Sequence, residues 1–280
     1  FHSNNRNKIK KIKKNKKYFK NQYASKLIKT LSYLLTNGQK QIIKEIEIDL
    51  MSAQRMFRIL QGDVGSGKTI ISIVAALDVI EAGYQCGLMA PTAILAEQHF
   101  TLFKELIKKT NLKINFSLLT GKTDLKERKK ILEDLKNNKI NFLIGTHALF
   151  QQTINFNKLG LVIIDEQHKF GVQQRISFAK KGGTNCDILL MSATPIPRTM
   201  MMSIYGDMDT SRLMEKPVHR KKITTLSKPE KKIDDLWPFI KRKIDQNEQI
   251  FWVCPLIEDS NKLDFSSTAK LFKLLNAKFH

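Results

Sequence analysis

The most informative stretch of the sequence is an eight-residue loop motif with the phosphate-binding pattern G-x-x-x-x-G-K-[ST]. Lys68 brings a positive charge to β- and γ-phosphates, and the hydroxyl of Thr69 can bind Mg²⁺. Apolar runs at 56–60 and 70–77 flank the motif, as expected when a strand enters such a loop and a helix leaves it. An ordinary glycine-rich turn would lack that context, so we expect a nucleotide site. Its predicted ligands are the residues that can turn backbone N–H groups or side chains toward phosphate: Gly62, Gly65, Ser66, Gly67, Lys68 and Thr69.

Two adjacent carboxylates follow a second apolar run, at 161–164. A buried strand of this kind delivers Asp165 and Glu166 to the edge of a sheet where a P-loop also lies. Asp165 can hold Mg²⁺ together with Thr69, and Glu166 can orient and deprotonate the water that attacks a γ-phosphate. The alternative is a strand that merely ends in a polar turn. The combination with the P-loop favours hydrolysis of ATP, with Lys68, Asp165 and Glu166 as catalytic residues.

Strands and helices alternate after the P-loop. Near-continuous apolar strands separated by amphipathic helices predict an α/β fold with a mostly parallel sheet, covered by helices on both faces. The carboxyl ends of such strands form the ligand crevice. The expected strands are 86–90, 114–119, 141–145, 161–164 and 187–191, and the expected helices are 93–109 and 125–137. Two earlier helices are expected on Leu27, Leu31, Leu34 and Leu35, and on Ile42, Ile43, Ile46 and Leu50.

Composition narrows the class of protein. A hydrophobic share of 42% over 280 residues is ample for a buried core. The net charge of +22 favours a polyanion such as nucleic acid, although a coding bias toward lysine would give the same charge. The three cysteines form no C-x-x-C pair, so neither a zinc ribbon nor a disulfide framework is indicated. Because no apolar run reaches the ~18 residues of a membrane span, and the start is too charged for a signal peptide, we expect a cytoplasmic protein without a membrane partner.

The two ends of the sequence differ from its middle. Residues 1–20 hold nine basic residues and no acid, which predicts a basic, partly disordered leader over 1–34; a direct contact with DNA is the alternative. The first residue is not Met, which suggests a fragment. Beyond residue 217 the pattern restarts with 223–226, a helical stretch at 231–246 interrupted at Pro238, and a strand at 250–254. We therefore expect one domain at 35–220 and the incomplete start of a second at 221–280.

The motifs resemble those of superfamily 2 helicases. Asp165-Glu166-Gln167-His168 is similar to their D-E-x-H box, and Ser192-Ala193-Thr194 to their S-A-T motif. Further motifs resemble the RecG family, the bacterial ATP-dependent helicases that branch-migrate DNA: QGDVGSGKT (61–69), APT (90–92), GTHAL (145–149), KFGVQQR (169–175), TPIPRT (194–199), YGDMD (205–209) and VCPLIE (253–258). The resemblance spans residues 35–260. It implies a RecA-like P-loop NTPase lobe followed by the truncated start of a second one.

The resemblance also implies roles for single residues. Gln39 matches the glutamine that reads adenine, a role for which an amide can donate and accept at once; a surface glutamine is the alternative. His168, as part of the D-E-x-H box, is a fourth implied catalytic residue, and it would hydrogen-bond toward Ser192 or Thr194 and so couple the nucleotide state to domain closure. Arg198, in the proline-rich turn, would transmit motion or contact DNA, and its role stays open. Contacts with the DNA backbone are implied for Thr92, Thr120, Gly121, Thr146 and His147, for which plain loop-forming chemistry is the alternative.

ATP and Mg²⁺ are the implied cofactors and branched or forked DNA the implied partner, for a monomer in the bacterial cytoplasm, close to the nucleoid. The family's wedge domain and its later arginine motifs are absent from this sequence, so we expect the chain alone to bind nucleotide weakly and hydrolyse it slowly. A transcription-repair coupling translocase would share 170–172 and 194–199, but the pair Gln167-His168 favours the RecG family. A basic binding module without turnover is the alternative from another class.

Overall fold

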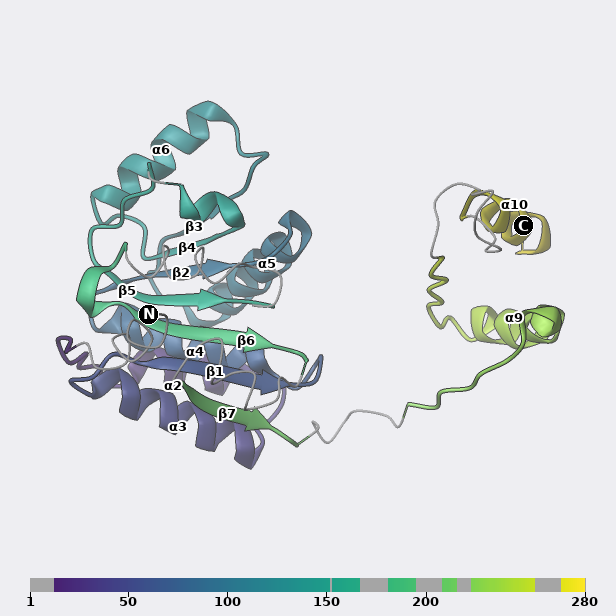
Figure 1. The fold of residues 1–280 in the computed structure, drawn as a ribbon, viewed down its shortest axis with the longest axis horizontal. Coiled ribbons are helices and arrows are strands. Elements are labelled where there is room, and N and C mark those ends of the chain that lie inside the picture. The colour runs from purple at the N-terminus through teal and green to yellow at the C-terminus, as the bar shows by residue number, and fades with distance from the viewer. Residues whose placement is uncertain are drawn as a thin grey trace, which may run out of the picture. The chain divides into compact units, whose positions relative to one another are not determined.

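The computed structural model of the chain describes residues 13–151, 153–166, 181–194, 208–215, 223–254 and 268–279. Contacts divide the chain into two compact units, 1–220 and 221–280. The first unit holds the sheet and the helices that cover it (Figure 1). The second holds short helices.

One sheet organises the first unit. All pairs of its seven strands run parallel, in the order β3-β4-β2-β5-β6-β1-β7. This confirms the expected α/β fold. The edge strand β7 was not predicted, because only two of its five residues, Ser211 and Leu213, are buried and it lacks an apolar run. The strands are β1 (Phe57–Gly62), β2 (Gln85–Met89), β3 (Phe116–Leu119), β4 (Phe142–Gly145), β5 (Leu159–Ile164), β6 (Asp187–Ser192) and β7 (Asp209–Leu213).

Helices cover both faces of the sheet, since successive strand residues point to opposite sides. Leu161 and Ile163 pack with α2 to α5 in one core cluster, whereas Val162 and Ile164 pack with α6 in the other. Helix α4 is buried on nearly all sides because α2 and α3 also pack against it, which explains its almost entirely apolar sequence. The helices are α2 (Gln22–Thr30), α3 (Asn37–Met51), α4 (Lys68–Glu81), α5 (Ala93–Thr110) and α6 (Leu125–Lys136).

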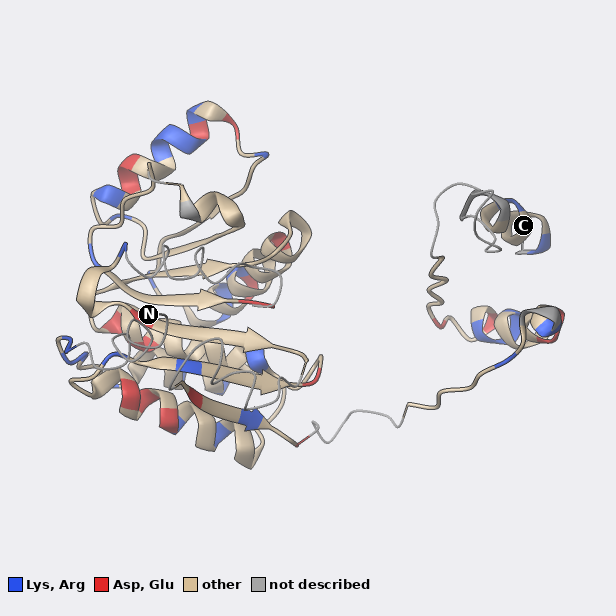
Figure 2. Cartoon of the chain, viewed as in Figure 1, with Lys and Arg blue, Asp and Glu red and all other residues tan. Residues whose placement is uncertain are grey.

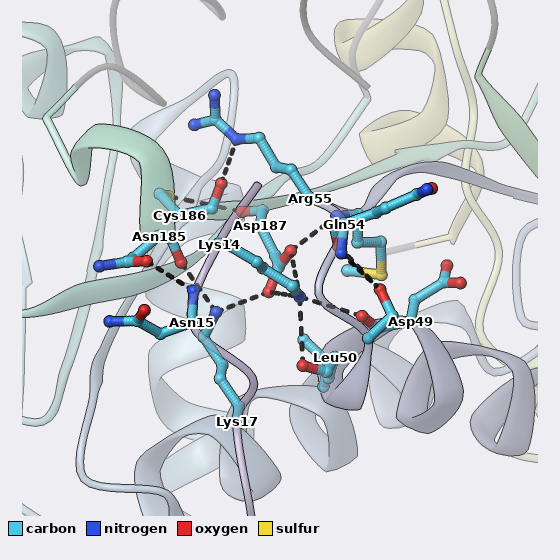
Figure 3. Close-up of polar contacts among 12 residues, drawn as sticks. Lys14, Asn15, Lys17, Asp49, Leu50, Gln54, Arg55, Asn185, Cys186 and Asp187 are labelled. Atoms are coloured by element: carbon cyan, nitrogen blue, oxygen red, sulfur yellow. Dashed lines mark hydrogen bonds and ion pairs between the residues drawn. The ribbon is translucent and has the colours of Figure 1, made fainter. Parts of the chain in front are cut away.

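The basic segment that precedes α2 differs from the expected leader. Residues 13–20, here called the amino-terminal strap, lie against the sheet, where Lys14 and Lys17 both form ion pairs with Asp187 at the start of β6, at 2.6 and 2.7 Å (Figure 3). Both lysine side chains are fully buried. The helix expected through Leu34 ends at Thr30, because the next residue has extended dihedrals, and Leu34 is 92% exposed.

The second unit contains η4 (Glu230–Leu236), α9 (Trp237–Asp245) and α10 (Thr268–Phe279). Pro238 lies in the first turn of α9 rather than interrupting a helix, a position where its missing N–H costs nothing. The strand predicted at 250–254 does not form. Residues 223–226 also adopt no strand. A strand needs a hydrogen-bonded neighbour, and Phe251 and Val253 are instead 84% and 88% exposed.

Within the described parts of the chain, every helix is too short or too polar to cross a membrane.

Candidate nucleotide site

The P-loop joins β1 to α4, and its glycines are required by the geometry. Gly65 and Gly67 have φ of 77° and 95°, in the left-handed region that favours glycine. A Cβ on Gly67 would lie 2.2 Å from Nε2 of Gln39, and one on Gly62 would lie 2.7 Å from Oγ of Ser66. Because α4 begins directly after Gly67, the loop presents the unpaired N–H groups of a helix N-terminus, which favour anions.

Lys68, the first residue of α4, folds back over this loop. Its Nζ donates to the carbonyl oxygens of Gly62 at 2.6 Å and Asp63 at 3.0 Å. Burial lowers the pKa of Lys68, while the nearby carboxylates of Glu166, Asp165 and Asp63 act in the opposite direction. The ammonium is thus held by uncharged acceptors, which a phosphate can replace, and the two predicted catalytic acids lie close enough to influence it.

The acids follow β5 directly. The Asp165 N–H donates to the carbonyl of Met89 at 2.8 Å, which extends the pairing of β5 with β2. Oδ1 of Asp165 accepts the Glu166 N–H at 2.9 Å, and Oδ2 lies 2.8 Å from Nε2 of His99 on α5. Glu166 has φ 45°, and a non-glycine residue in this region costs on the order of 1–3 kcal/mol. The chain therefore turns tightly after the strand and keeps both carboxyl groups at the edge of the sheet.

His99 was not predicted as a site residue. It lies between Ala96 and Phe103 on the buried stripe of α5, where an amphipathic helix normally carries apolar side chains. A histidine on an otherwise apolar stripe is the signal that could have found it, but its partner, 66 residues later, is visible only in the fold.

Gln39 connects α3 to the P-loop. It forms a capping box with Thr36, whose N–H donates to Oε1 of Gln39 at 2.9 Å. Nε2 of Gln39 donates to the carbonyl of Ser66 at 2.8 Å, and only 3% of the residue is exposed. Beside it, the Gly38 N–H donates to Oε2 of Glu215 at 3.1 Å, a contact that lowers the pKa of Glu215 together with the Thr36 hydroxyl. Gln39 is therefore not the surface glutamine of the alternative reading, and Glu215 is a neighbour that the sequence did not reveal.

The residues implied in DNA contact follow three neighbouring strands, β3, β4 and β2, and so lie along one edge of the sheet. Thr92, Gly121 and His147 are exposed there. Thr120 and Thr146 are buried, at 4% exposure each. The Thr120 hydroxyl accepts the Lys122 N–H at 3.2 Å, and the Thr146 hydroxyl has no hydrogen-bond partner among the described residues. The structure thus brings all five to one edge but exposes three.

The S-A-T segment lies at the end of β6 on the same edge. The Ser192 hydroxyl donates to the carbonyl oxygen of Thr194 at 3.1 Å and lies 3.2 Å from its hydroxyl. His168 and Arg198 fall outside the described residues, so their predicted coupling roles stay predictions.

The chemistry of the side chains present fits Mg²⁺. Asp165 and Thr69 offer hard oxygen donors, and no group of three or more His, Cys, Asp or Glu side chains suited to a metal occurs in the described ranges. Mg²⁺ is commonly held by one or two protein oxygens while substrate phosphates and water complete its shell. A sparse oxygen site of this kind suits a metal that arrives with a nucleotide.

Comparison with known proteins identifies relatives of this chain. RecG, an ATP-dependent DNA helicase, is 45% identical in Thermotoga maritima over 253 residues, which cover 90% of this chain and 32% of the relative. RecG of Bacillus subtilis is 42% identical over 261 residues, which cover 93% of this chain and 38% of the relative. A solved structure of RecG bound to a three-way DNA junction matches with a TM-score of 0.77 at 37% identity, over 98% of this chain and 35% of that one. The expected similarity to RecG is confirmed, and the chain spans about a third of the length of these relatives.

A family model described as DEAD/DEAH box helicase matches residues 36–203. This range includes the P-loop, both acids, the S-A-T segment and all the strands from β1 to β6. Since the match exceeds half of the chain, the chain belongs to the DEAD/DEAH box helicase family.

Proposed function

We propose that the protein carrying this chain is a RecG-type DNA helicase, which couples ATP hydrolysis to branch migration of forks and Holliday junctions. The observation that carries the proposal is the meeting of Lys68, Asp165 and Glu166 at one edge of the sheet, beside the P-loop. Similarity to RecG over 90% or more of the chain supports the choice of substrate.

In this mechanism the P-loop N–H groups receive the phosphates, and Lys68 exchanges the carbonyls of Gly62 and Asp63 for phosphate oxygens. Thr69 and Asp165 would hold Mg²⁺, which neutralises charge on the β- and γ-phosphate oxygens when bound. Glu166 orients the attacking water and takes its proton. Most of the rate comes from this positioning and charge neutralisation.

Gln39 retains enough hydrogen-bonding groups to recognise adenine. An amide offers two N–H donors and an oxygen with two lone pairs. The contacts to Ser66 and Thr36 use one donor and one lone pair. The remaining N–H and lone pair match the donor–acceptor edge of adenine.

The edge with Thr92, Gly121 and His147 is where we place the DNA backbone, with Thr120 and Thr146 contributing from beneath. Helix α6, which follows Gly121, carries five basic and three acidic residues (Figure 2), a balance that favours phosphate. Ser192 and Thr194, with His168 and Arg198, would pass the nucleotide state to the second lobe. We place the protein in the bacterial cytoplasm near the nucleoid, as a monomer.

The test is DNA-stimulated ATP hydrolysis by the full-length protein. Lys68→Ala and Glu166→Gln should abolish it, whereas Lys44→Ala and Glu97→Gln, at exposed positions on α3 and α5, serve as matched controls. Turnover that survives either of the first two changes would refute the assigned roles. Forked DNA should stimulate more than linear duplex, and equal stimulation by both would favour a transcription-repair coupling translocase instead.

A further inference from the structure

His99 is in direct contact with the predicted metal ligand, Asp165. Its Nε2 lies 2.8 Å from Oδ2 of Asp165, and their side chains are only 10% and 12% exposed. An ionised carboxylate only accepts hydrogen bonds, so Nε2 is the donor. Since the Glu166 N–H occupies Oδ1, each oxygen of Asp165 has one fixed donor.

The position of the His99 ring is set by its helix. Four residues further along α5, Phe103 is fully buried and packs edge-on against Phe116 and Phe142, with ring centroids 4.9 and 4.7 Å apart. Both partners lie on neighbouring strands, β3 and β4. The aromatic cluster therefore fixes α5 against the sheet, and His99 meets Asp165 as a rigid donor.

We infer that His99 is a positioning residue, which holds the Asp165 carboxylate in the orientation that Mg²⁺–nucleotide requires. The inference rests on the proposed function. Mg²⁺ demands near-ideal octahedral geometry, and a carboxylate tied only at Oδ1 can rotate about that contact. Donors that orient a metal ligand in this way typically contribute about 10- to 100-fold in metal affinity or activity.

Two substitutions separate the donor from the bulk of the ring. His99→Gln places an amide N–H at a reach similar to that of Nε2, whereas His99→Leu keeps much of the volume and has no donor. The readout is binding rather than turnover: affinity for a non-hydrolysable ATP analogue by calorimetry, with and without Mg²⁺, and Mn²⁺ affinity by electron paramagnetic resonance. We expect His99→Leu to weaken metal affinity about 10- to 100-fold, His99→Gln to stay within a few-fold of the parent, and metal-free nucleotide affinity to be equal in all three.

A purely structural role for His99 predicts other results. Parental metal affinity in His99→Leu would overturn the inference, and so would equal weakening by Leu and Gln, because the donor would then not matter. Where His99→Leu does not fold, His99→Asn replaces it, since its shorter amide falls short of Asp165. In an Asp165→Asn background, His99→Leu should cause no further loss of metal affinity, and an added loss would contradict the route through Asp165.

DNA-stimulated turnover of the unaltered full-length protein keeps this test separate from the proposed function. If the full-length protein shows no DNA-stimulated ATP hydrolysis, the proposed function fails. The metal-binding series reports on His99 in either case, since it is measured without hydrolysis.

Discussion

Replacing Asp187 with Asn should lower the free energy of unfolding of the first unit by more than the loss of a single surface charge would. Asp187 accepts hydrogen bonds from Nζ of Lys14 at 2.7 and 2.6 Å, from Nζ of Lys17 at 2.7 Å and from the N–H of Met56 at 2.7 Å. Its side chain and those of both lysines are 0% exposed. The substitution leaves two buried ammonium groups without their counter-charge.

The expected loss is about 3–5 kcal/mol in the free energy of unfolding, the range for breaking a buried ion pair. A domain of this kind is stable by only about 5–15 kcal/mol, so the loss is a large part of the total. Backbone carbonyls should reduce this loss. Lys14 also donates to the carbonyl oxygens of Asp49 and Leu50, and Lys17 to that of Asn185, at 2.8–3.1 Å.

The defect should shrink as the pH rises. Burial lowers the pKa of Lys14 below its ordinary value of 10.5, and Asp187 opposes that shift. A lysine with a lowered pKa binds fewer protons folded than unfolded, so stability rises with pH between the two values. Without Asp187 the pKa of Lys14 in the folded state falls further, so the pH range over which stability rises extends to lower pH. Asp187→Asn should therefore recover part of its lost stability on the alkaline side.

The assay is urea unfolding followed by far-ultraviolet circular dichroism, supported by amide exchange of β6. Tryptophan fluorescence is unsuitable because both tryptophans, Trp237 and Trp252, lie in the second unit. Asp124→Asn, at an exposed helix start without a side-chain cap, is the matched control. A change below about 1 kcal/mol for Asp187→Asn, the size of a surface pair, would show that the strap is not held by this cluster.

Three further substitutions test the site and its surroundings. Gly67→Ala should abolish nucleotide binding in calorimetry, because its Cβ would lie 2.2 Å from Nε2 of Gln39 at φ 95°; retained affinity would contradict the geometry. Gln39→Ala should reduce the preference for ATP over GTP in equilibrium binding, and an unchanged ratio would remove Gln39 from adenine reading. Asp78 is fully buried, and burial, Glu47 and Glu81 raise its pKa from 3.8 to about 8, so the folded state binds more protons and stability falls as the pH rises from about 4 to 8. Asp78→Asn should remove that fall, on the order of a few kcal/mol, in urea titrations across this range, and an unchanged slope would show that Asp78 is not its cause.

The parts of the fold that could be predicted have local causes. Strands β2 to β6 are apolar runs, and the P-loop is a contiguous motif, so a short window contains all the information. The sequence also placed Asp165 and Glu166 correctly at a strand end, since parallel strands all end at the same edge.

The parts that could not be predicted depend on partners far away in the sequence. Lys14 and Lys17 belong to a charge run that is typical of a solvated segment, and their burial depends on the carboxylate of Asp187, about 170 residues later. The contact between His99 and Asp165 spans 66 residues, and that between Gly38 and Glu215 spans 177. Such pairs become visible only when the sheet order is known.

The strap offers an experimental reference point. Tyr18 lies between the buried Lys17 and Lys20, whose N–H donates to Glu81 at 2.8 Å, yet Tyr18 itself is 74% exposed. A spectroscopic label at Tyr18 would therefore move together with the first unit and not independently of it. It would also stand near the opposite end of β6 from Ser192, roughly 20 Å away for a strand of this length. Distances measured from such a label would report any movement of the first unit when nucleotide is added, without disturbing the edge that carries Asp165 and Glu166.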